Sequence, residues 1–313
     1  MTIKYRSVTA ISFLILMVFM GNKPQSDTFP ELKGPYLGQR PPGMIPQIFA
    51  PGIISTDVTE RSSWFSRDGN TFVFSRWGGE RTGIFVMDQK NGTWSKPEKF
   101  PHLDPEYDGD FLFSPDGNKL VFSSQRPLHE EGNKLENCHI YIMEKTEYGW
   151  QEPVRLGSEV NSGMHDSYPC LTADYTLYFF SRRSGGFGNA DTYRSKFTDG
   201  KYNEIENLGK PVNTGYHDLD AFVAPDESYM ILCSDRPGSY GEEDLYISFK
   251  KTGGLWTEPV NMGEDFNSQG SEWIPYVTPD GKYFFFTSNK TGNRDIYWVD
   301  AMIIEQFRPD KGK

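Results

Sequence analysis

The chain has very little cysteine. Its 313 residues include three, Cys138, Cys170 and Cys233, and their spacing matches no zinc-binding pattern. Cys170 and Cys233 stand among apolar, strand-forming residues, where a thiol packs as a small hydrophobic group. The sequence therefore predicts neither a disulfide framework nor a zinc site.

Positive charge and familiar catalytic motifs are also scarce. The formal net charge is -11 at pH 7, and so acidic a surface repels phosphate backbones, which argues against nucleic acid as a partner. The sequence contains no Gly-x-Ser-x-Gly elbow and no His-Glu-x-x-His pair. Serine hydrolase and zincin chemistry are therefore disfavoured.

Long apolar runs are missing except near the start. A basic segment, residues 1–6, precedes an apolar run at residues 8–20, which is the order found in secretory signal peptides. The run is too short to span a bilayer comfortably as a helix, and no cysteine follows it that would carry a lipid. We expect residues 1–26 to be a cleaved signal peptide, no transmembrane span in the mature protein, and a periplasmic or secreted location. An uncleaved signal anchor is the alternative.

The sequence does contain one motif that is repeated five times: an apolar strand, a turn built on aspartate, and a second strand rich in aromatics. The copies lie at residues 64–69, 111–117, 170–174, 222–226 and 276–281. A repeat of about fifty residues has the length of a four-stranded propeller blade. The 31 glycines and the 15% aromatic content suit many short strands joined by tight turns.

The repeat predicts an all-β fold, a β-propeller of five four-stranded blades. The fifth unit lacks its fourth strand, and residues 46–55 have the same pattern of residue types as that strand in other units. We therefore expect the N-terminal segment to supply the missing outer strand and close the ring. The predicted domain covers residues 46–307, between a linker at 27–45 and a tail at 308–313. A sixth, degenerate blade built from residues 302–307 and 37–44 is the alternative.

Three motifs carry a resemblance to a known family. The Ser-Pro-Asp-Gly turn, the Ser-x-Arg after the second strand and the Asp-Ile-Tyr of the third strand resemble the Pro-Asp variant of the WD repeat in TolB-like propellers of the bacterial cell envelope. The resemblance covers about residues 46–300. Such propellers include periplasmic scaffolds and also parts of peptidases and sugar-active enzymes, so the resemblance implies a location more than an activity.

A carboxylate stands at the start of each first strand, and a cation follows each second strand. The acids are Glu60, Asp108, Asp166, Asp218 and Glu272, and the cations are Arg76, Arg126, Arg182 or Arg183, Arg236 and Lys290. Because the pattern recurs in every blade, we expect a structural acid ring at one channel mouth, in which acids and cations hold the loops. A ring that binds Ca²⁺ or a cationic ligand is the alternative. The spacing of an EF-hand loop is absent, and neither a metal nor another cofactor is predicted.

Residues that break the symmetry are better candidates for ligand contact. His165 and His217 precede ring acids in two adjacent repeats, where the other repeats have different residues. Together with nearby aromatic and basic residues they predict a ligand-binding face at the channel mouth. The predicted ligand-binding residues are His165, Tyr168, Arg183, His217, Trp273 and Tyr107.

Two functions follow from these features. The first is an exported, non-catalytic, monomeric module that binds an envelope protein or a glycan. The alternative is a carbohydrate-active enzyme, a glycosidase or a polysaccharide lyase, since an inverting glycosidase needs two carboxylates flanking its substrate. Its candidate acid and base residues are His165, Asp166, His217, Asp218 and Glu272. Unpaired acids in a deep funnel favour the enzyme, and a mouth closed by ion pairs favours the binding module.

Overall fold

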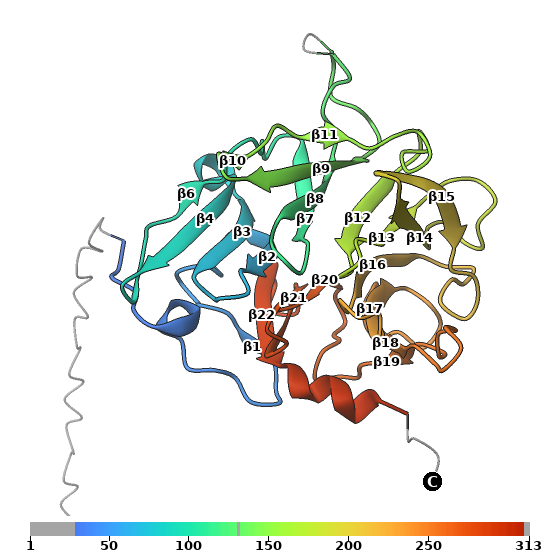
Figure 1. Cartoon of the computed structure of the whole chain (residues 1–313). Helices are drawn as coiled ribbons and strands as arrows, with labels where there is room; N and C mark the ends of the chain where they lie inside the picture. The colour runs from blue at the N-terminus through green and yellow to red at the C-terminus, as the bar shows by residue number, and fades with distance from the viewer. Residues whose placement is uncertain (1–28, 130–131, 310–313) are drawn as a thin grey trace, which may run out of the picture. The chain divides into compact units, whose positions relative to one another are not determined.

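The computed structural model describes residues 29–129 and 132–309, and in them five antiparallel sheets form the five blades of a propeller (Figure 1). The propeller belongs to the compact unit of residues 32–313. The predicted signal peptide, residues 1–26, lies outside the described residues. None of the described helices is long and apolar enough to cross a membrane.

The blades follow one another along the chain, each beginning with its innermost strand. Blade 1 contains β2 (Thr59–Phe65), β3 (Thr71–Trp77), β4 (Gly83–Lys90), β5 (Thr93–Trp94) and β6 (Glu98–Lys99). Blade 2 contains β7 (Asp108–Phe113), β8 (Lys119–Ser124), β9 (His139–Thr146), β10 (Gly149–Trp150) and β11 (Val154–Arg155). Blade 3 contains β12 (Asp166–Leu171), β13 (Leu177–Ser181), β14 (Asp191–Thr198) and β15 (Lys201–Asn207).

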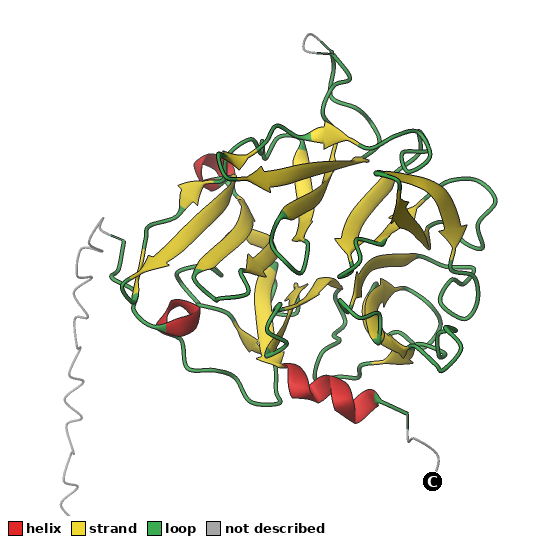
Figure 2. Ribbon diagram, viewed as in Figure 1, coloured by secondary structure: helices red, strands yellow, loops and turns green. Residues whose placement is uncertain are grey.

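The last two blades complete the ring. Blade 4 contains β16 (Asp218–Val223), β17 (Tyr229–Ser234), β18 (Asp244–Phe249) and β19 (Val260–Asn261). Blade 5 contains β20 (Glu272–Val277), β21 (Tyr283–Ser288), β22 (Asp295–Asp300) and, from the other end of the chain, β1 (Gln47–Ile48). Three short 3-10 helices lie outside the sheets, drawn in red in Figure 2: η1 (Pro35–Gly38), η2 (Gly79–Arg81) and η3 (Ala301–Phe307).

The predicted closure of the ring is confirmed. β1 pairs antiparallel with β22, with Gln47 opposite Trp298 and Ile48 opposite Tyr297. Ser55 Oγ then accepts a hydrogen bond of 3.2 Å from the backbone N–H of Ile296. The six-bladed alternative is wrong, because residues 301–307 form η3 rather than a strand and the described strands make five sheets.

Proline explains why the outer strands are short. In blade 1, Pro97 separates β5 from β6, and in blade 2, Pro153 separates β10 from β11. Proline has no N–H to give to the sheet, so it interrupts the ladder, which only an edge strand tolerates. Blade 3 has no proline between Lys201 and Asn207, and its outer strand β15 runs unbroken.

The repeated turn is closed by side-chain hydrogen bonds. In blade 2, Ser114 Oγ donates to Asp116 Oδ1 at 2.5 Å and accepts from the backbone N–H of Lys119 at 2.9 Å. Asp116 Oδ1 also accepts from the backbone N–H of Asn118 at 3.2 Å. The hydroxyl and the carboxylate thus bind the first backbone N–H groups of the next strand. This is the physical reason for the Ser-x-Asp motif.

Part of the predicted linker is paired with blade 1. The N–H of Gly34 donates to the carbonyl of Gly92 at 2.9 Å, and the N–H of Trp94 donates to the carbonyl of Leu32 at 2.9 Å. The ring of Tyr36 then packs edge-on against Tyr283 of blade 5, with the centroids 4.6 Å apart. Residues 32–36 therefore add a second connection between blades 5 and 1.

Candidate functional site

The ring acids lie buried within their own blades. We call the end of the propeller that carries them the acid face and the end that carries the repeated turns the turn face. Four of the five acids form an ion pair with the cation that follows the second strand. The pairs are Glu60 with Arg76, Asp108 with Arg126, Asp166 with Arg183, and Asp218 with Arg236. Each acid is at most 2% exposed.

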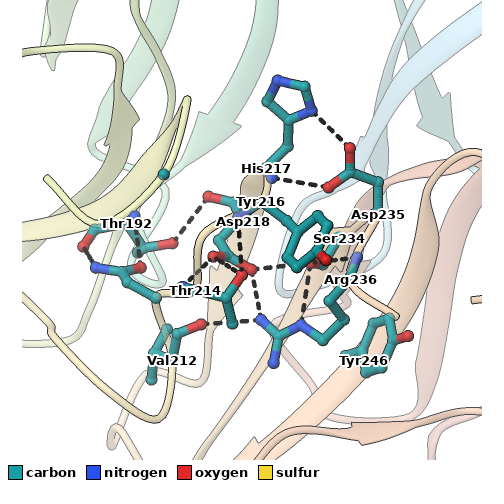
Figure 3. Close-up of polar contacts among 12 residues, drawn as sticks. Thr192, Val212, Thr214, Tyr216, His217, Asp218, Ser234, Asp235, Arg236 and Tyr246 are labelled. Carbon is teal, nitrogen blue, oxygen red and sulfur yellow. Dashed lines mark hydrogen bonds and ion pairs between the residues drawn. The ribbon is translucent and has the colours of Figure 1, made fainter. Parts of the chain in front are cut away.

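Blade 4 shows the arrangement in full (Figure 3). Asp218 accepts hydrogen bonds from Ser234 Oγ at 2.8 Å and from the backbone N–H of Thr214. Arg236 donates both to Asp218 and, at 2.9 Å, to the carbonyl of Val212. The guanidinium therefore joins the start of the first strand to the loop before it. A carboxylate so enclosed is satisfied without a ligand.

Blade 5 departs from the pattern. Glu272 has no ion pair among the described residues, and its carboxyl is held by Ser268 Oγ at 2.7 Å and Ser288 Oγ at 2.6 Å. Burial raises the pKa of Glu272 above its ordinary value. Lys290 lies 4.4 Å from the ring centroid of Tyr297, and burial lowers its pKa. The last blade thus holds its loop with hydroxyl groups where the others use a guanidinium.

The two histidines lie beside ring acids but have partners of their own. His217 Nδ1 and the backbone N–H of His217 both contact the carboxylate of Asp235 at 2.8 Å, as Figure 3 shows. His165 stacks on Phe180 at 5.7 Å, and burial, followed by the charge of Arg182, lowers its pKa. Both histidines are partly exposed, so each presents one edge at the acid face.

The channel is blocked below the acid face. Tyr168 of blade 3 is fully buried, and its hydroxyl donates to the carbonyl of Pro275 in blade 5 at 2.7 Å. Blades 3 and 5 are not neighbours in the ring, so this bond crosses the channel. Toward the turn face the channel is lined by apolar side chains such as Leu112 and Phe222, around a cavity of only about 20 Å³. Tyr168 is therefore part of the packing and not an accessible ligand contact.

A charged cluster above Tyr168 escaped the sequence analysis. Asp110 of blade 2 forms an ion pair of 2.9 Å with Arg61 of blade 1. Asp220 of blade 4 is 7% exposed. Its burial, and then the negative charge of Asp110, raise the pKa of Asp220 to about 8. A carboxylate and a protonated carboxyl therefore share the channel mouth near neutral pH.

These residues occupy one position of the repeat, two after each ring acid. In blades 2 to 5 the position holds Asp110, Tyr168, Asp220 and Ile274, all with positive φ, at a bulge where the pairing of the first two strands shifts register. In blade 1 it holds Ser62, whose buried hydroxyl has no partner in the described structure. The sequence carried one signal for this position: its residue type varies from repeat to repeat, whereas the ring acid two residues earlier is always a carboxylate. The position varies because its side chain lines the channel.

The remaining predicted residues have partners of their own. The Arg294 guanidinium lies 4.1 Å from the ring centroid of Trp273, and burial, followed by the charge of Arg61, lowers the pKa of Arg294. Tyr107 is partly exposed in blade 2, with the Lys134 ammonium 5.8 Å from its ring centroid. Arg183 is already engaged with Asp166. The accessible groups of the acid face are thus aromatic rings, histidines and guanidinium groups.

No group of three or more metal-ligating side chains comes together in residues 29–129 and 132–309. Each ring acid is turned toward hydroxyl or backbone N–H groups, and those of blades 1 to 4 also toward the cation. The five carboxylates accordingly do not converge on one point. The geometry gives no support to a shared Ca²⁺ site formed by the ring.

The fold and the filled channel define a class: a closed five-bladed propeller whose acid face is held together from within each blade. Its similarity to solved structures is that of a TolB-like β-propeller. The putative TolB of Agrobacterium tumefaciens has a TM-score of 0.51 and 15% identity, over 78% of this chain and 77% of that one. TolB of Acinetobacter baumannii has a TM-score of 0.46 and 20% identity, over 79% of this chain, which spans 55% of that protein.

At these identities the likeness shows the fold alone. An α-L-arabinofuranosidase from Lactobacillus brevis is also similar, with a TM-score of 0.47 and 13% identity, over 77% of this chain and 91% of that one. No family model and no curated protein matches the sequence. A shared fold leaves the activity open.

Proposed function

We propose that this protein is a non-catalytic binding module of the cell envelope, and that its acid face takes a protein or glycan ligand. The observation that carries the proposal is the state of the ring acids. Asp166, Asp218 and Glu272, the carboxylates first considered for glycoside hydrolysis, are each fully buried and hydrogen-bonded. A general acid must reach the bond it protonates. These three do not reach a bound sugar.

The groups that do face outward have binding chemistry. Trp273 with Arg294 offers a flat surface of an aromatic ring and a guanidinium, and the partly exposed His165 and His217 add hydrogen-bonding edges. Aromatic and arginine side chains dominate the binding energy of protein interfaces. Aromatic faces also stack on sugar rings. The ligand class is therefore a question for a direct screen.

The test is a glycan array together with a pull-down from envelope extract. Any ligand found is then titrated against Trp273→Ala, with Tyr148→Ala as the matched control, since Tyr148 is an exposed aromatic residue, 91% accessible, on the hairpin between β9 and β10. We expect Trp273→Ala to weaken binding at least tenfold and Tyr148→Ala to leave it unchanged. Equal affinities for both variants would remove the acid face from the proposal.

Export is a separate part of the proposal, supported by the basic start and the apolar run at residues 8–20. Fractionation of cells that express the full chain tests it. We expect a shortened protein in the periplasm or the medium. An unprocessed chain retained in the cytoplasm would contradict export without touching the assignment of the binding face.

One observation favours the carbohydrate-active alternative. Asp110 and Asp220 stand in different environments at the channel mouth, one paired with Arg61 and the other buried with a pKa raised to about 8. A carboxyl kept protonated near neutral pH can act as the acid, and the carboxylate paired with Arg61 can act as the base. Hydrolysis of chromogenic glycosides between pH 5 and 8 tests this. Turnover that disappears in Asp220→Asn would establish the enzyme, and its absence across a broad panel would support the binding module.

A further inference from the structure

A cleft of about 510 Å³ lies between blades 1 and 2 on the turn face, away from the acid face. Its lining includes Trp64 and Asp68 from blade 1 and Phe113, Lys145 and Trp150 from blade 2. The rings of Trp64 and Phe113 stack at 3.8 Å and form its floor. The cleft thus combines aromatic surface with charged and hydrogen-bonding groups.

The corresponding places at other junctions are filled by the chain itself. Between blades 2 and 3, Tyr175 donates its hydroxyl to Asp116 at 2.6 Å. Between blades 3 and 4, Glu227 accepts from the hydroxyl of Tyr178. Between blades 4 and 5, the segment after β22 places Phe307 against Phe266 at 6.3 Å.

The cleft is open because of one glycine. Tyr175 and Glu227 each follow the turn aspartate of their blade, with φ of 63° and 57°. In blade 2 that position holds Gly117, with φ of 74°. The nearest atom that an added Cβ would meet is an edge carbon of Trp64, 4.0 Å away. Gly117 therefore leaves the space that a side chain occupies in blades 3 and 4.

Residues 32–36 show what fills the junction between blades 5 and 1, where the turn of blade 1 also has a glycine, Gly69. The carbonyl of Gly34 accepts from Trp94 Nε1 at 2.8 Å and from Gln89 Nε2. Two residues later, the hydroxyl of Tyr36 donates to Asp280 Oδ2 at 3.2 Å. A short segment that enters the turn η1 and carries a tyrosine is thus held by an indole, an amide and a turn carboxylate.

The cleft between blades 1 and 2 repeats these binding groups. Trp150 pairs with Lys145 in blade 2 as Trp94 pairs with Gln89 in blade 1. Lys145 is, like Gln89, a donor for a peptide carbonyl.

The floor and the acceptor also have counterparts. The ring of Tyr36 packs on Phe65 at 5.1 Å, and Phe113 holds the position of Phe65 in the next repeat. The turn carboxylate is Asp68 in place of Asp280. Asp68 Oδ1 accepts from Ser66 Oγ and from the backbone N–H of Asn70.

We propose that this cleft binds a short turn-forming segment of a partner protein that presents a tyrosine, in the way that residues 32–36 bind between blades 5 and 1. A carbonyl of the partner accepts from Trp150 Nε1 and Lys145, and the tyrosine two residues later donates its hydroxyl to Asp68. Thr71 and Val86 stand where blade 5 has the larger Tyr283 and Trp298, so the cleft has room for the ring. This site goes beyond the proposed ligand of the acid face.

The probe is a synthetic peptide with the sequence of residues 30–39, Pro-Glu-Leu-Lys-Gly-Pro-Tyr-Leu-Gly-Gln, titrated into the full-length protein by calorimetry. We expect saturable binding at one site per chain. Phenylalanine in place of the peptide's tyrosine weakens binding about tenfold, because a hydrogen bond to a charged acceptor is lost. An unchanged affinity for the phenylalanine peptide would overturn the proposal.

Variants of the protein locate the site. Gly117→Tyr places a tyrosine where Tyr175 stands in the next blade and should abolish binding, while the junction between blades 5 and 1 is untouched. If Gly117→Tyr does not fold, Trp150→Phe and Asp68→Asn test the same site, and each should weaken binding about tenfold. The matched control is Asp174→Asn, since Asp174 is bonded within its turn as Asp68 is.

Asp174→Asn should bind the peptide as the wild type does. Peptide binding that Gly117→Tyr leaves intact would place the peptide elsewhere and overturn the proposal. Cellotriose and chitotriose are titrated in parallel. Sugar binding that Gly117→Tyr abolishes, without peptide binding by the wild type, would assign the cleft to a glycan instead.

Discussion

Carboxylates at the two ends of the inner strands have pKa values that are shifted in opposite directions. On the turn face, hydrogen bonds from Ser66 and Thr172 lower the pKa values of Asp68 and Asp174. On the acid face, burial raises the pKa values of Glu60 and Glu272. A turn aspartate is stabilised as an anion by groups within a few residues of it. A ring acid such as Glu272 also uses a nearby hydroxyl, but it depends in addition on a cation or a hydroxyl that lies more than ten residues away.

The comparison teaches which acids join the parts of a blade together. Removing a turn aspartate leaves exposed groups that water can bind. Removing the partner of a ring acid leaves an unpaired buried charge, and this lowers the free energy of unfolding far more. The pH dependence also has opposite signs, because acids with lowered pKa values stabilise the fold as pH rises, and acids with raised pKa values do the reverse.

The largest effect is expected at the guanidinium of blade 4. Arg236→Leu leaves Asp218 buried without its cation, and Arg236 also bonds the carbonyl of Val212. We expect a loss of about 3–5 kcal/mol in the free energy of unfolding, the usual cost of breaking a buried pair from one side. Chemical denaturation at pH 7 measures it.

The matched control is Arg194→Leu, which removes a partly exposed guanidinium from the outer part of blade 3, where its partner Glu206 is 60% exposed. A surface pair of this kind contributes about 0–1 kcal/mol. Equal losses for the two variants would show that the ring pairs are ordinary surface pairs.

The second prediction concerns the channel mouth. The folded-state pKa of Asp220, about 8, lies above its unfolded value, so its contribution to stability is present below about pH 4 and is lost as pH rises through 8. Asp220→Asn keeps the neutral shape and does not ionise. The stability of Asp220→Asn minus that of wild type should therefore rise by about 3–4 kcal/mol between pH 5 and pH 8. Parallel stability curves between these pH values would mean that Asp220 is not the titrating group.

The sequence predicted the ring and its closure because both rest on repetition. A fifty-residue period fixes a four-stranded blade, and the missing fourth strand of the last repeat points to residues 46–55. The channel mouth was not predictable in the same way. The roles of Asp110 and Asp220 depend on a bulge with positive φ, and no sequence motif predicts such a bulge. The pairing of His217 with Asp235 likewise joins the residue before β16 to the residue after β17, and only the register of these strands reveals it.

The third prediction returns to the turn face. Although burial opposes ionisation, hydrogen bonds from Ser114 and Tyr175 lower the pKa of Asp116 to about 2. Its contribution is therefore present above the unfolded pKa near 4 and is lost as pH falls toward 2. Because the Asp116 carboxylate is exposed and water screens its charge, we expect Asp116→Asn to cost about 1 kcal/mol at pH 7 and progressively less below pH 4. Tyr175→Phe, which removes one donor, should reproduce part of the loss. A cost that grows on acidification would reverse the assignment.

The smallest effect on stability is expected for His217→Ala, although the residue adjoins a ring acid. His217 and its partner Asp235 are each about 30% exposed at the side chain, so water replaces the lost contact, and Asp235 can still accept from the backbone N–H of residue 217. We expect the free energy of unfolding to stay within about 0.5 kcal/mol of wild type, while any ligand of the acid face binds less tightly. Thermal melts and a titration with that ligand, run on the same preparation, separate the two roles. A large drop in stability with unchanged affinity would make His217 a structural residue, and the acid face would then have to recognise its ligand through Trp273 and Arg294.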